Sequence, residues 1–325
     1  MSHAFRGRAA VRAALLLGIA LAAFGAAMVV GTPARSMAQQ VPVFRAGVDL
    51  VNLGITVTDR KGRLLTDLKA EDFEVREDGK VQTVRYFSAG EPGPPAPELH
   101  LGLLLDVSES MGDDIKFTRT AAIKFLNTLV DAVDVTVVDF DSEVRVGRYG
   151  QKEFARLIER IRQQKTTGMT ALYDAIGVYL DGAPGLDGRK IMLLYTDGGD
   201  TRSSMRWSDL QTLLKASDVT VYAIGELDHQ SSSARTQART ILSGIAELTG
   251  GAALFPSSVK ELDQIYEKVL AEIRAQYTIG YHSTNGTADG AWRKVDVTIA
   301  PGRGKDVRIR SRKGYFATYK APAKP

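Results

Sequence analysis

The chain has 325 residues, which is enough for about two domains with substantial hydrophobic cores. Its 42 basic and 38 acidic residues give a formal net charge of +4, and this excess lies in the first 38 residues, which hold four arginines and no acidic residue. Beyond residue 38 the chain is formally neutral. Nucleic-acid binding depends on a basic domain or stripe, so no nucleic-acid partner is expected.

The first 38 residues have the pattern of a secretory signal peptide. Three arginines precede an apolar stretch, Ala13–Val30, and the small-residue pattern Ser36-Met37-Ala38 ends the segment. These features predict cleavage after Ala38 and a protein that is secreted or held in the periplasm or cell envelope. The apolar stretch is also long enough for an uncleaved anchor, and membrane association is expected only in that case. The chain has no cysteine, which excludes a lipoprotein anchor and disulfides.

Residues 39–90 are predicted to form the first half of a β domain. In the strand Val48–Asp59, apolar side chains alternate with polar ones, as in a half-buried strand. The apolar face of this strand consists of Val51, Leu53, Ile55 and Val57. The strands Phe73–Glu77 and Lys80–Phe87 flank Asp78-Gly79, a pair that favours the type I′ turn of a hairpin. A proline-rich linker follows at residues 91–97 and marks a domain boundary.

From residue 98 to residue 275, predicted strands alternate with predicted helices, which is the pattern of a mainly parallel sheet. Apolar runs predict the strands Leu99–Asp106, Asp134–Phe140, Val144–Tyr149, Lys190–Thr196, Val219–Gly225 and Ala252–Phe255. Helices are predicted at Ile115–Val130, Gln151–Gln163, Ala171–Leu180, Trp207–Lys215, Ala234–Leu248 and Val259–Ala275. We therefore expect an α/β fold with a doubly wound, mainly parallel sheet and helices on both faces.

The pattern returns to β structure after Ala275, with strands predicted at Tyr277–His282, Trp292–Ile299 and Val307–Arg310. Residues 276–320 are predicted to form the second half of the β domain, and residues 321–325 a disordered tail. Three strands with one apolar face are near the lower limit for independent stability. We therefore expect the two halves to form one β-sandwich-like domain, with residues 98–275 inserted between them.

The most informative segment is Asp106-Val-Ser108-Glu-Ser110, which directly follows the apolar run Leu101–Leu105. Alternate residues of an extended loop point the same way, so one carboxylate and two hydroxyls converge where the strand ends. Thr170 precedes a predicted helix, and Asp197 follows a second apolar run. Ligands of open α/β sheets bind outside the carboxyl ends of the strands. Oxygen groups gathered there suit a small hard cation.

This set of residues resembles the metal-ion-dependent adhesion site of von Willebrand factor type A domains, in a secreted bacterial form. The resemblance extends from about Glu98 to Arg274 and includes five positions in three segments. It implies a doubly wound fold and a divalent cation, with Mg²⁺ favoured and Mn²⁺ or Ca²⁺ as alternatives. The implied metal ligands are Asp106, Ser108, Ser110, Thr170 and Asp197.

The resemblance also implies an exported, non-enzymatic module for adhesion or protein interaction. Two carboxylates and three neutral hydroxyls leave the cation able to attract a carboxylate from a protein partner, without a general base. Two alternatives stay open: a metal-dependent enzyme or subunit of an enzyme assembly, and a scaffold with a vestigial metal site. Hydrolysis would need a base or an activated water, and only His229 follows a strand on the metal side.

Structural roles compete with the metal hypothesis at several positions. The segment Ser110–Asp113 could cap the following helix, and Asp197-Gly198 could form a turn. Asp139 and Asp141 are predicted to frame the turn between two strands rather than to bind metal.

Arginines recur on one face of the last predicted strand and just after it, at positions 308, 310 and 312. An anion-binding patch is one interpretation. A solvated edge strand that is protected by its charges is the favoured one.

Overall fold

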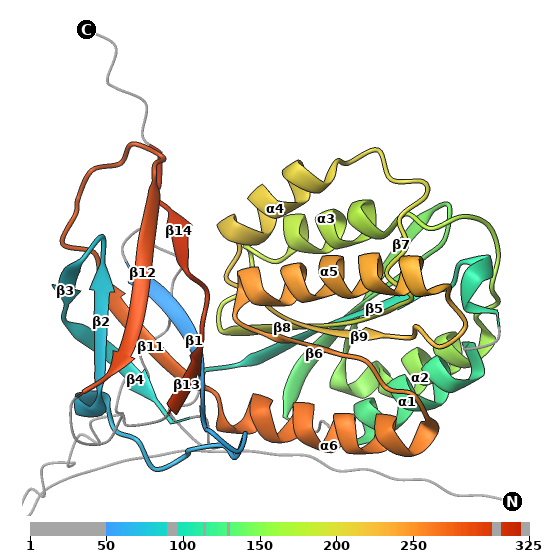
Figure 1. The fold of residues 1–325 in the computed structure, drawn as a ribbon, viewed down its shortest axis with the longest axis horizontal. Coiled ribbons are helices and arrows are strands. Elements are labelled where there is room, and N and C mark those ends of the chain that lie inside the picture. The colour runs from blue at the N-terminus through green and yellow to red at the C-terminus, as the bar shows by residue number, and fades with distance from the viewer. Residues whose placement is uncertain (1–49, 90–96, 113–114, 129–130, 301–306, 320–325) are drawn as a thin grey trace, which may run out of the picture. The chain divides into compact units, whose positions relative to one another are not determined.

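The computed structural model describes residues 50–89, 97–112, 115–128, 131–300 and 307–319 (Figure 1). All described elements belong to one compact unit, Pro42–Pro325. The predicted signal peptide, nearly all of the predicted linker and the predicted tail lie outside the described residues. Among the helices of the described part, none is long and apolar enough to cross a membrane.

A six-stranded sheet forms the middle of the α/β region, in the order β10-β9-β8-β5-β6-β7. Its strands are β5 (Leu99–Asp106), β6 (Ala132–Phe140), β7 (Val144–Gly150), β8 (Arg189–Thr196), β9 (Thr220–Gly225) and β10 (Ala252–Leu254). Neighbouring strands are parallel except β6 and β7, which are antiparallel. From β5 the chain continues to β6, which pairs with one edge of β5, and β8 later pairs with the other edge of β5. The carboxyl ends of β5 and β8 therefore border the switch point, where such sheets bind ligands.

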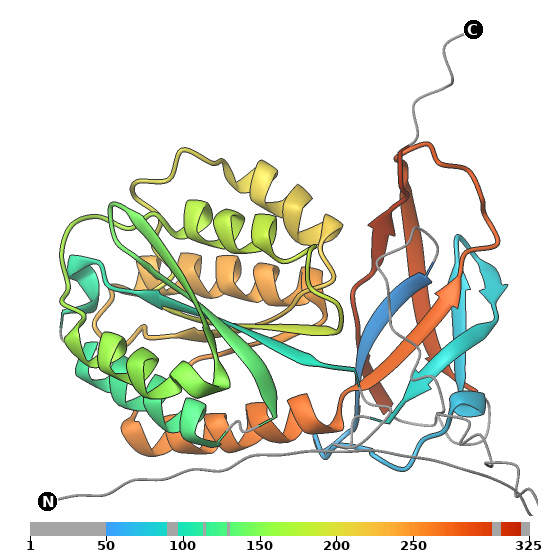
Figure 2. The same cartoon turned by 180° about the vertical axis from the view of Figure 1, so that it is seen from behind.

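Helices cover both faces of this sheet (Figures 1 and 2). One face carries α1 (Ile115–Thr128), α2 (Phe154–Gln163) and α6 (Val259–Ala275), and the other carries α3 (Leu172–Gly182), α4 (Trp207–Ala216) and α5 (Ser232–Thr249). Short 3-10 helices occur at η1 (Ala70–Asp72), η2 (Glu109–Met111) and η3 (Gln151–Glu153). Strand β5 contributes Leu103 to one hydrophobic core and Leu104 to the other, because successive strand residues face opposite sides. The predicted doubly wound α/β fold is confirmed.

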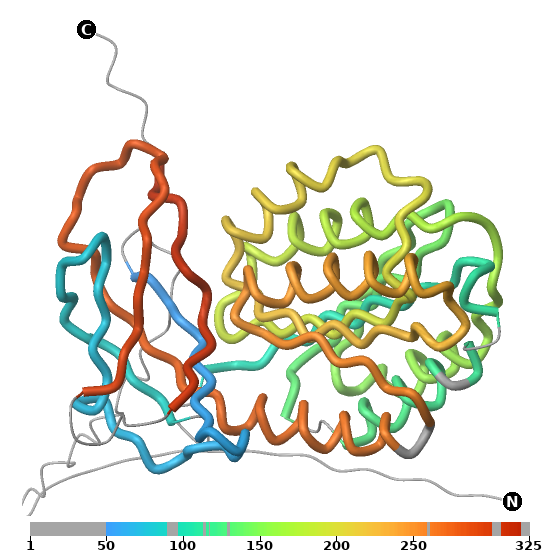
Figure 3. Tube along the Cα trace, in the orientation of Figure 1, coloured from blue at the N-terminus to red at the C-terminus, as the bar shows by residue number. Residues whose placement is uncertain are grey.

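The β region contains two four-stranded sheets, in the orders β13-β1-β11-β4 and β14-β12-β2-β3. Their strands are β1 (Leu50–Asp59), β2 (Phe73–Glu77), β3 (Lys80–Gln82), β4 (Val84–Ser88), β11 (Tyr277–His282), β12 (Trp292–Ile299), β13 (Val307–Arg310) and β14 (Gly314–Phe316). Each sheet mixes strands from both ends of the chain, with Leu53 opposite Ile279 in one and Val75 opposite Val297 in the other. The expected β-sandwich-like domain therefore forms from both flanks. Figure 3 shows α6 leading directly into β11.

A buried carboxylate joins the two flanks inside this domain. Glu77, the last residue of β2, accepts hydrogen bonds from the hydroxyls of Tyr281 (2.9 Å), Ser283 (2.6 Å) and Tyr315 (2.8 Å). Burial, together with the adjacent Glu77 carboxylate, raises the pKa of Tyr315 to about 12, so this hydroxyl stays protonated and donates. The apolar face predicted for β1 is buried in the same core: Val51, Leu53, Ile55 and Val57.

Two details of the β segments differ from the prediction. The segment Lys80–Phe87 is two strands in different sheets: β3 pairs with β2, whereas β4 pairs with β11. Alternation of apolar residues continues through such a crossing, so the pattern does not reveal it. The short strand β14 was not predicted, because three residues are too few for a clear period. The turn between β2 and β3 is as predicted, since Asp78 and Gly79 have φ of 47° and 81°.

The arginines near the last strand do more than protect an edge. Arg310 pairs with Glu272 of α6 and donates to the carbonyl of Gly251 at 3.2 Å. Arg312 donates to the carbonyls of Asn52 at 2.7 Å and Ser217 at 3.3 Å. The interpretation of a solvated edge is therefore wrong for these two residues, because tertiary contacts bring backbone carbonyls and a carboxylate to them. They connect the last β strands to the α/β region.

Candidate metal centre

Asp106 ends β5 and is fully buried. Its Oδ1 accepts from the N–H of Ser108 at 3.0 Å and from the Ser108 hydroxyl at 2.6 Å. Its Oδ2 accepts from the hydroxyl of Thr196 at 2.6 Å. Burial raises the pKa of Asp106 to about 7. The nearby charge of Asp197 also raises this pKa, whereas the hydrogen bonds from Ser108 and Thr196 lower it. The ionised carboxylate is thus poorly compensated by the protein, and a bound cation would supply the missing positive charge.

Ser108 and Ser110 extend the site from the loop after β5. Ser108 is buried and precedes η2, and its Oγ lies 3.1 Å from the Oγ of Ser110, which is exposed. The N–H of Glu109 donates to the carbonyl of Gly168 at 3.1 Å, and the N–H of Thr167 donates to the carbonyl of Val107 at 2.9 Å. This loop is therefore tied to the segment that contains Thr170.

Thr170 is buried and lies just before α3. Its N–H donates to the hydroxyl of Thr201 at 3.0 Å. Its carbonyl accepts from the N–H groups of Thr201 at 2.9 Å and Arg202 at 3.0 Å. The Thr170 segment therefore contacts the loop after β8 as well as the loop after β5.

Asp197 directly follows β8, and its Oδ1 accepts from the N–H of Gly199 at 2.9 Å. Gly198 has φ of 79°, and a Cβ there would lie 2.8 Å from the Cβ of Ala238 on α5, so the close turn requires glycine. The predicted turn at Asp197-Gly198 is present. The turn also keeps the Asp197 carboxylate close enough for its charge to affect the pKa of Asp106.

A second layer of polar residues holds these loops, and the sequence did not identify it as part of the site. Asp141, which follows β6, accepts at Oδ2 from the hydroxyl of Thr167 at 2.8 Å. Ser142 accepts at Oγ from the N–H of Met169 at 2.9 Å. Burial opposes ionisation of Asp141, but hydrogen bonds from Arg145 above all hold its pKa below the usual value. The predicted role of Asp141 in a turn is correct, since its Oδ1 accepts from the N–H of Glu143 at 2.9 Å.

Thr196 is another residue of the site that the sequence analysis did not identify. Its signal in the sequence is a polar residue at the end of the apolar run of β8. Its hydroxyl donates to Asp106 and accepts from the N–H of Gly198 at 3.0 Å. It therefore orients the carboxylate and fixes the turn that carries Asp197.

The donor set fits a hard divalent cation by its chemistry. Two carboxylates match the charge of the ion, and neutral hydroxyl oxygens complete a set that Mg²⁺ accepts. No cluster of three or more His, Cys, Asp or Glu suited to a metal occurs in the described part of the chain. His229, the histidine considered as a base, is exposed on the loop after β9.

Comparison with known proteins gives three findings. The family model for the von Willebrand factor type A domain matches residues 100–268. No curated protein matches the chain. Similar solved structures include the von Willebrand factor type A protein from Catenulispora acidiphila, with a TM-score of 0.44, 14% identity, and coverage of 85% of this chain and 75% of that one.

Two further similar structures come from pili. The pilus adhesin SpaC from Lactobacillus rhamnosus GG has a TM-score of 0.46 and 12% identity, covering 75% of this chain and 47% of SpaC. The vWF domain of the type V pili tip protein Mfa5 from Porphyromonas gingivalis has a TM-score of 0.44 and 13% identity, covering 55% of this chain and 97% of that one. The part of the present chain that matches SpaC thus spans about half the length of SpaC.

Proposed function

Because the chain belongs to the von Willebrand factor type A domain family, we propose that it binds a protein partner through a divalent cation at the carboxyl ends of β5 and β8. Asp106 and Asp197 would hold the cation by charge, and Ser108, Ser110 and Thr170 by hydroxyl oxygens. Mg²⁺ is the first candidate, followed by Mn²⁺ and Ca²⁺. When bound, the cation supplies an electrophilic centre that attracts a carboxylate of the partner.

The observation that carries the proposal is the environment of Asp106. A fully buried carboxylate whose partners are neutral hydroxyls and one N–H is costly to ionise, and its pKa near 7 expresses that cost. A dication removes this cost by supplying the opposite charge. The hydrogen bonds from Ser108 and Thr196 keep the carboxylate oriented before a cation arrives.

The surroundings of the centre suit recognition of a partner surface. Ser110 and Met169 are exposed, and Met169 is 51% accessible although it adjoins the buried Thr170. Partner contacts around the centre would thus combine a charged interaction with an apolar one. We propose that this activity is binding without bond cleavage. We also propose that the protein acts outside the cytoplasm after removal of residues 1–38.

Calorimetry of the purified chain tests the proposal in two stages. Each of Mg²⁺, Mn²⁺ and Ca²⁺ is titrated first. Short peptides with a central Glu are then titrated into the cation-loaded protein, with the same peptides carrying Gln as matched controls. We expect binding of the Glu peptides only, and its loss in EDTA. Cation binding without any preference for Glu would indicate a scaffold, and peptide binding that persists in EDTA would contradict a metal-bridged contact.

A further inference from the structure

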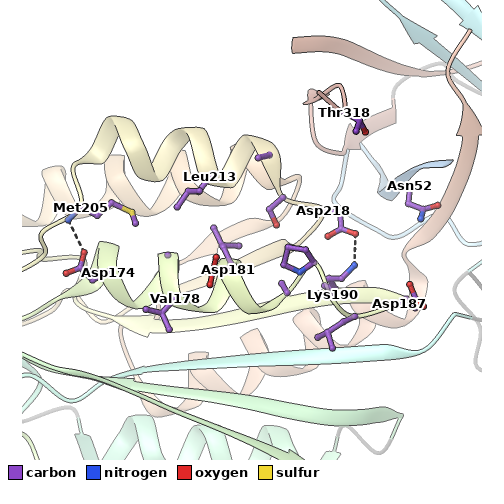
Figure 4. A pocket seen from close by; sticks show the side chains of 18 of the residues that line it. Asn52, Asp174, Val178, Asp181, Asp187, Lys190, Met205, Leu213, Asp218 and Thr318 are labelled. Atoms are coloured by element: carbon purple, nitrogen blue, oxygen red, sulfur yellow. Dashed lines mark hydrogen bonds and ion pairs between the residues drawn. The ribbon is translucent and has the colours of Figure 1, made fainter. Parts of the chain in front are cut away.

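A groove of about 1100 Å³ runs along α3 and α4 (Figure 4). Its walls come mainly from these two helices and from the loop at residues 183–188, and Asn52 of β1 and Thr318 border it. None of its lining residues in the described part of the chain belongs to the candidate metal centre. Small-molecule sites usually measure ~300–1000 Å³, so this groove has room for a segment of a polypeptide.

The groove is apolar beside the middle of α3. Two of the seven exposed large apolar side chains in the described part of the chain line it: Val178, which is 44% exposed, and Leu213, which is 38% exposed. Met205 packs over Gly177, where a Cβ would lie 2.5 Å from the Met205 Cε, so glycine is needed at this position. An occupant with apolar side chains would bury this surface and gain the free energy of removing it from water.

The groove also has four aspartates among its lining residues, and the protein itself compensates two of them. The carboxylate of Asp174 accepts from the N–H groups of Ser204 and Met205, both at 2.9 Å. Asp218 pairs with Lys190 at 2.6 Å (Figure 4). The one lysine that lines the groove in the described part of the chain is therefore already neutralised.

The other two aspartates, Asp181 and Asp187, are exposed. Among the residues that the structure describes, their carboxylates have no hydrogen-bond or ion-pair partner. Asp181 lies in the last turn of α3, which contains no basic residue. The free carbonyl groups at a helix C-terminus carry partial negative charge, so an acidic side chain is unfavourable there. This part of the groove therefore favours a cationic group from outside.

We propose that the groove binds a segment of a partner protein that carries large apolar side chains next to a lysine or arginine. The apolar side chains cover Val178 and Leu213, and the basic side chain pairs with Asp181 and Asp187. Because Val178 and Asp181 are three residues apart on α3, they lie on one face, about 5–6 Å apart. Alternate residues of an extended segment point the same way at about 6.6 Å, which matches this spacing.

This contact does not depend on the cation. Helix α3 has 11 residues and begins just after Thr170, so its acidic end lies about 16 Å along the helix from the metal side. The two sites also select opposite charges, an acidic side chain at the metal centre and a basic one in the groove. An experiment in EDTA therefore examines the groove alone, and its failure leaves the proposed metal-bridged contact untouched.

Selection from a random peptide library on the purified full chain in EDTA tests the proposal. Peptides of about 12 residues suffice, because about five extended residues span the length of α3. The library is first depleted on the variant with Asp181→Lys and Asp187→Lys, and is then selected on the parent. We expect the recovered peptides to combine lysine or arginine with large apolar residues and to contain few acidic ones. Recovery of no peptides, or of peptides without this bias, would overturn the proposal.

Fluorescence anisotropy then measures the affinity of a recovered peptide. Asp181→Lys and Leu213→Ser should each weaken binding at least about tenfold. Glu247→Lys is the matched control, since it reverses an exposed acidic residue in the last turn of α5, outside the groove, and should leave the affinity unchanged. Circular dichroism verifies that each variant is folded.

Two further results would contradict the proposal. Equal weakening by Glu247→Lys and Asp181→Lys would show attraction to the overall charge instead of binding in the groove. A parent protein that dimerises in sedimentation measurements, and becomes monomeric with Asp181→Lys, would assign the groove to a second copy of the chain.

Discussion

The hydroxyl of Thr167 donates a 2.8 Å hydrogen bond to Oδ2 of Asp141, although 26 residues separate the two in sequence. The carbonyl of Asp141 also accepts from the N–H of Ala171 at 2.8 Å. Thr170 lies between these two contacts, so one residue holds its segment from both sides. Arg145 holds Asp141 in turn, with two guanidinium contacts of 3.0 and 3.2 Å. The position of Thr170 thus depends on a residue that is not itself a proposed ligand.

Asp141→Asn should weaken cation binding without unfolding the protein. The substitution removes the charge that Arg145 holds and disturbs the Thr167 contact, and loss of such supporting residues typically lowers metal affinity by about 10-fold or more. Calorimetry with Mg²⁺ measures the change. Glu143→Gln is the matched control, since this carboxylate lies in the same loop with 81% of its side chain exposed. Equal affinities in the two variants would mean that the Thr170 segment is positioned independently of Asp141.

Asp106→Ala should abolish cation binding and leave the fold intact. The carboxylate is the buried centre of the proposed ligand set, so no neighbouring oxygen can replace it. Titration with Mg²⁺ and a circular dichroism spectrum measure binding and folding separately. Asp209→Ala, which removes an exposed carboxylate on α4, should bind like the parent. If Asp106→Ala binds Mg²⁺ with the parent affinity, the assignment of the centre is wrong.

The metal-free protein should lose stability as pH rises from about 4 to about 7. The pKa of Asp106 is near 7 in the folded protein and near 3.8 in the unfolded chain, so the folded state holds an extra proton in this window. Folding is therefore favoured at the acidic end, and deprotonation of the folded state costs up to a few kcal/mol. Asp106→Asn carries no charge, so its stability advantage over the parent should grow up to pH 7 and then stay constant. Urea denaturation in EDTA at several pH values measures this difference, and a pH-independent difference would contradict it.

Truncation after Ala275 should make the chain aggregate. The cut removes β11, the strand that pairs with β1 along Leu50–Ile55, and with it the cover of the apolar face of β1. A chain limited to residues 98–275 keeps the six-stranded sheet and its helices, and should stay soluble and bind the cation. Size-exclusion chromatography with light scattering compares the two. A monomeric, soluble chain that ends at Ala275 would refute the mutual dependence of the two flanks.

Protein isolated from the cell envelope or medium should begin at Gln39. The signal-peptide pattern at residues 1–38 predicts cleavage after Ala38. Intact-mass measurement decides the question, because retention of Ala13–Val30 would instead make this segment a membrane anchor.

Local sequence patterns were sufficient for most of the secondary structure. Strand β5 was predicted with its observed ends, as were β2, β11, β12, β13 and helix α6. Periodicity works for these elements because each packs apolar side chains against a hydrophobic core on one face or on both. The pairing of the two flanks could also be predicted. The apolar face of β1 must be buried, and neither flank has enough strands to be stable alone.

Only the tertiary structure decided the contacts that join distant segments. The crossing from β3 to β4, the bond from Thr196 to Asp106 and the bond from Thr167 to Asp141 all depend on which strands lie side by side. Periodicity records whether a residue is buried, and it contains no information about its neighbour across the sheet. The five proposed ligands could be named from the sequence because their motif resembles the metal-ion-dependent adhesion site of the family. The residues that hold them in place could be found only once the sheet order 10-9-8-5-6-7 had brought their loops together.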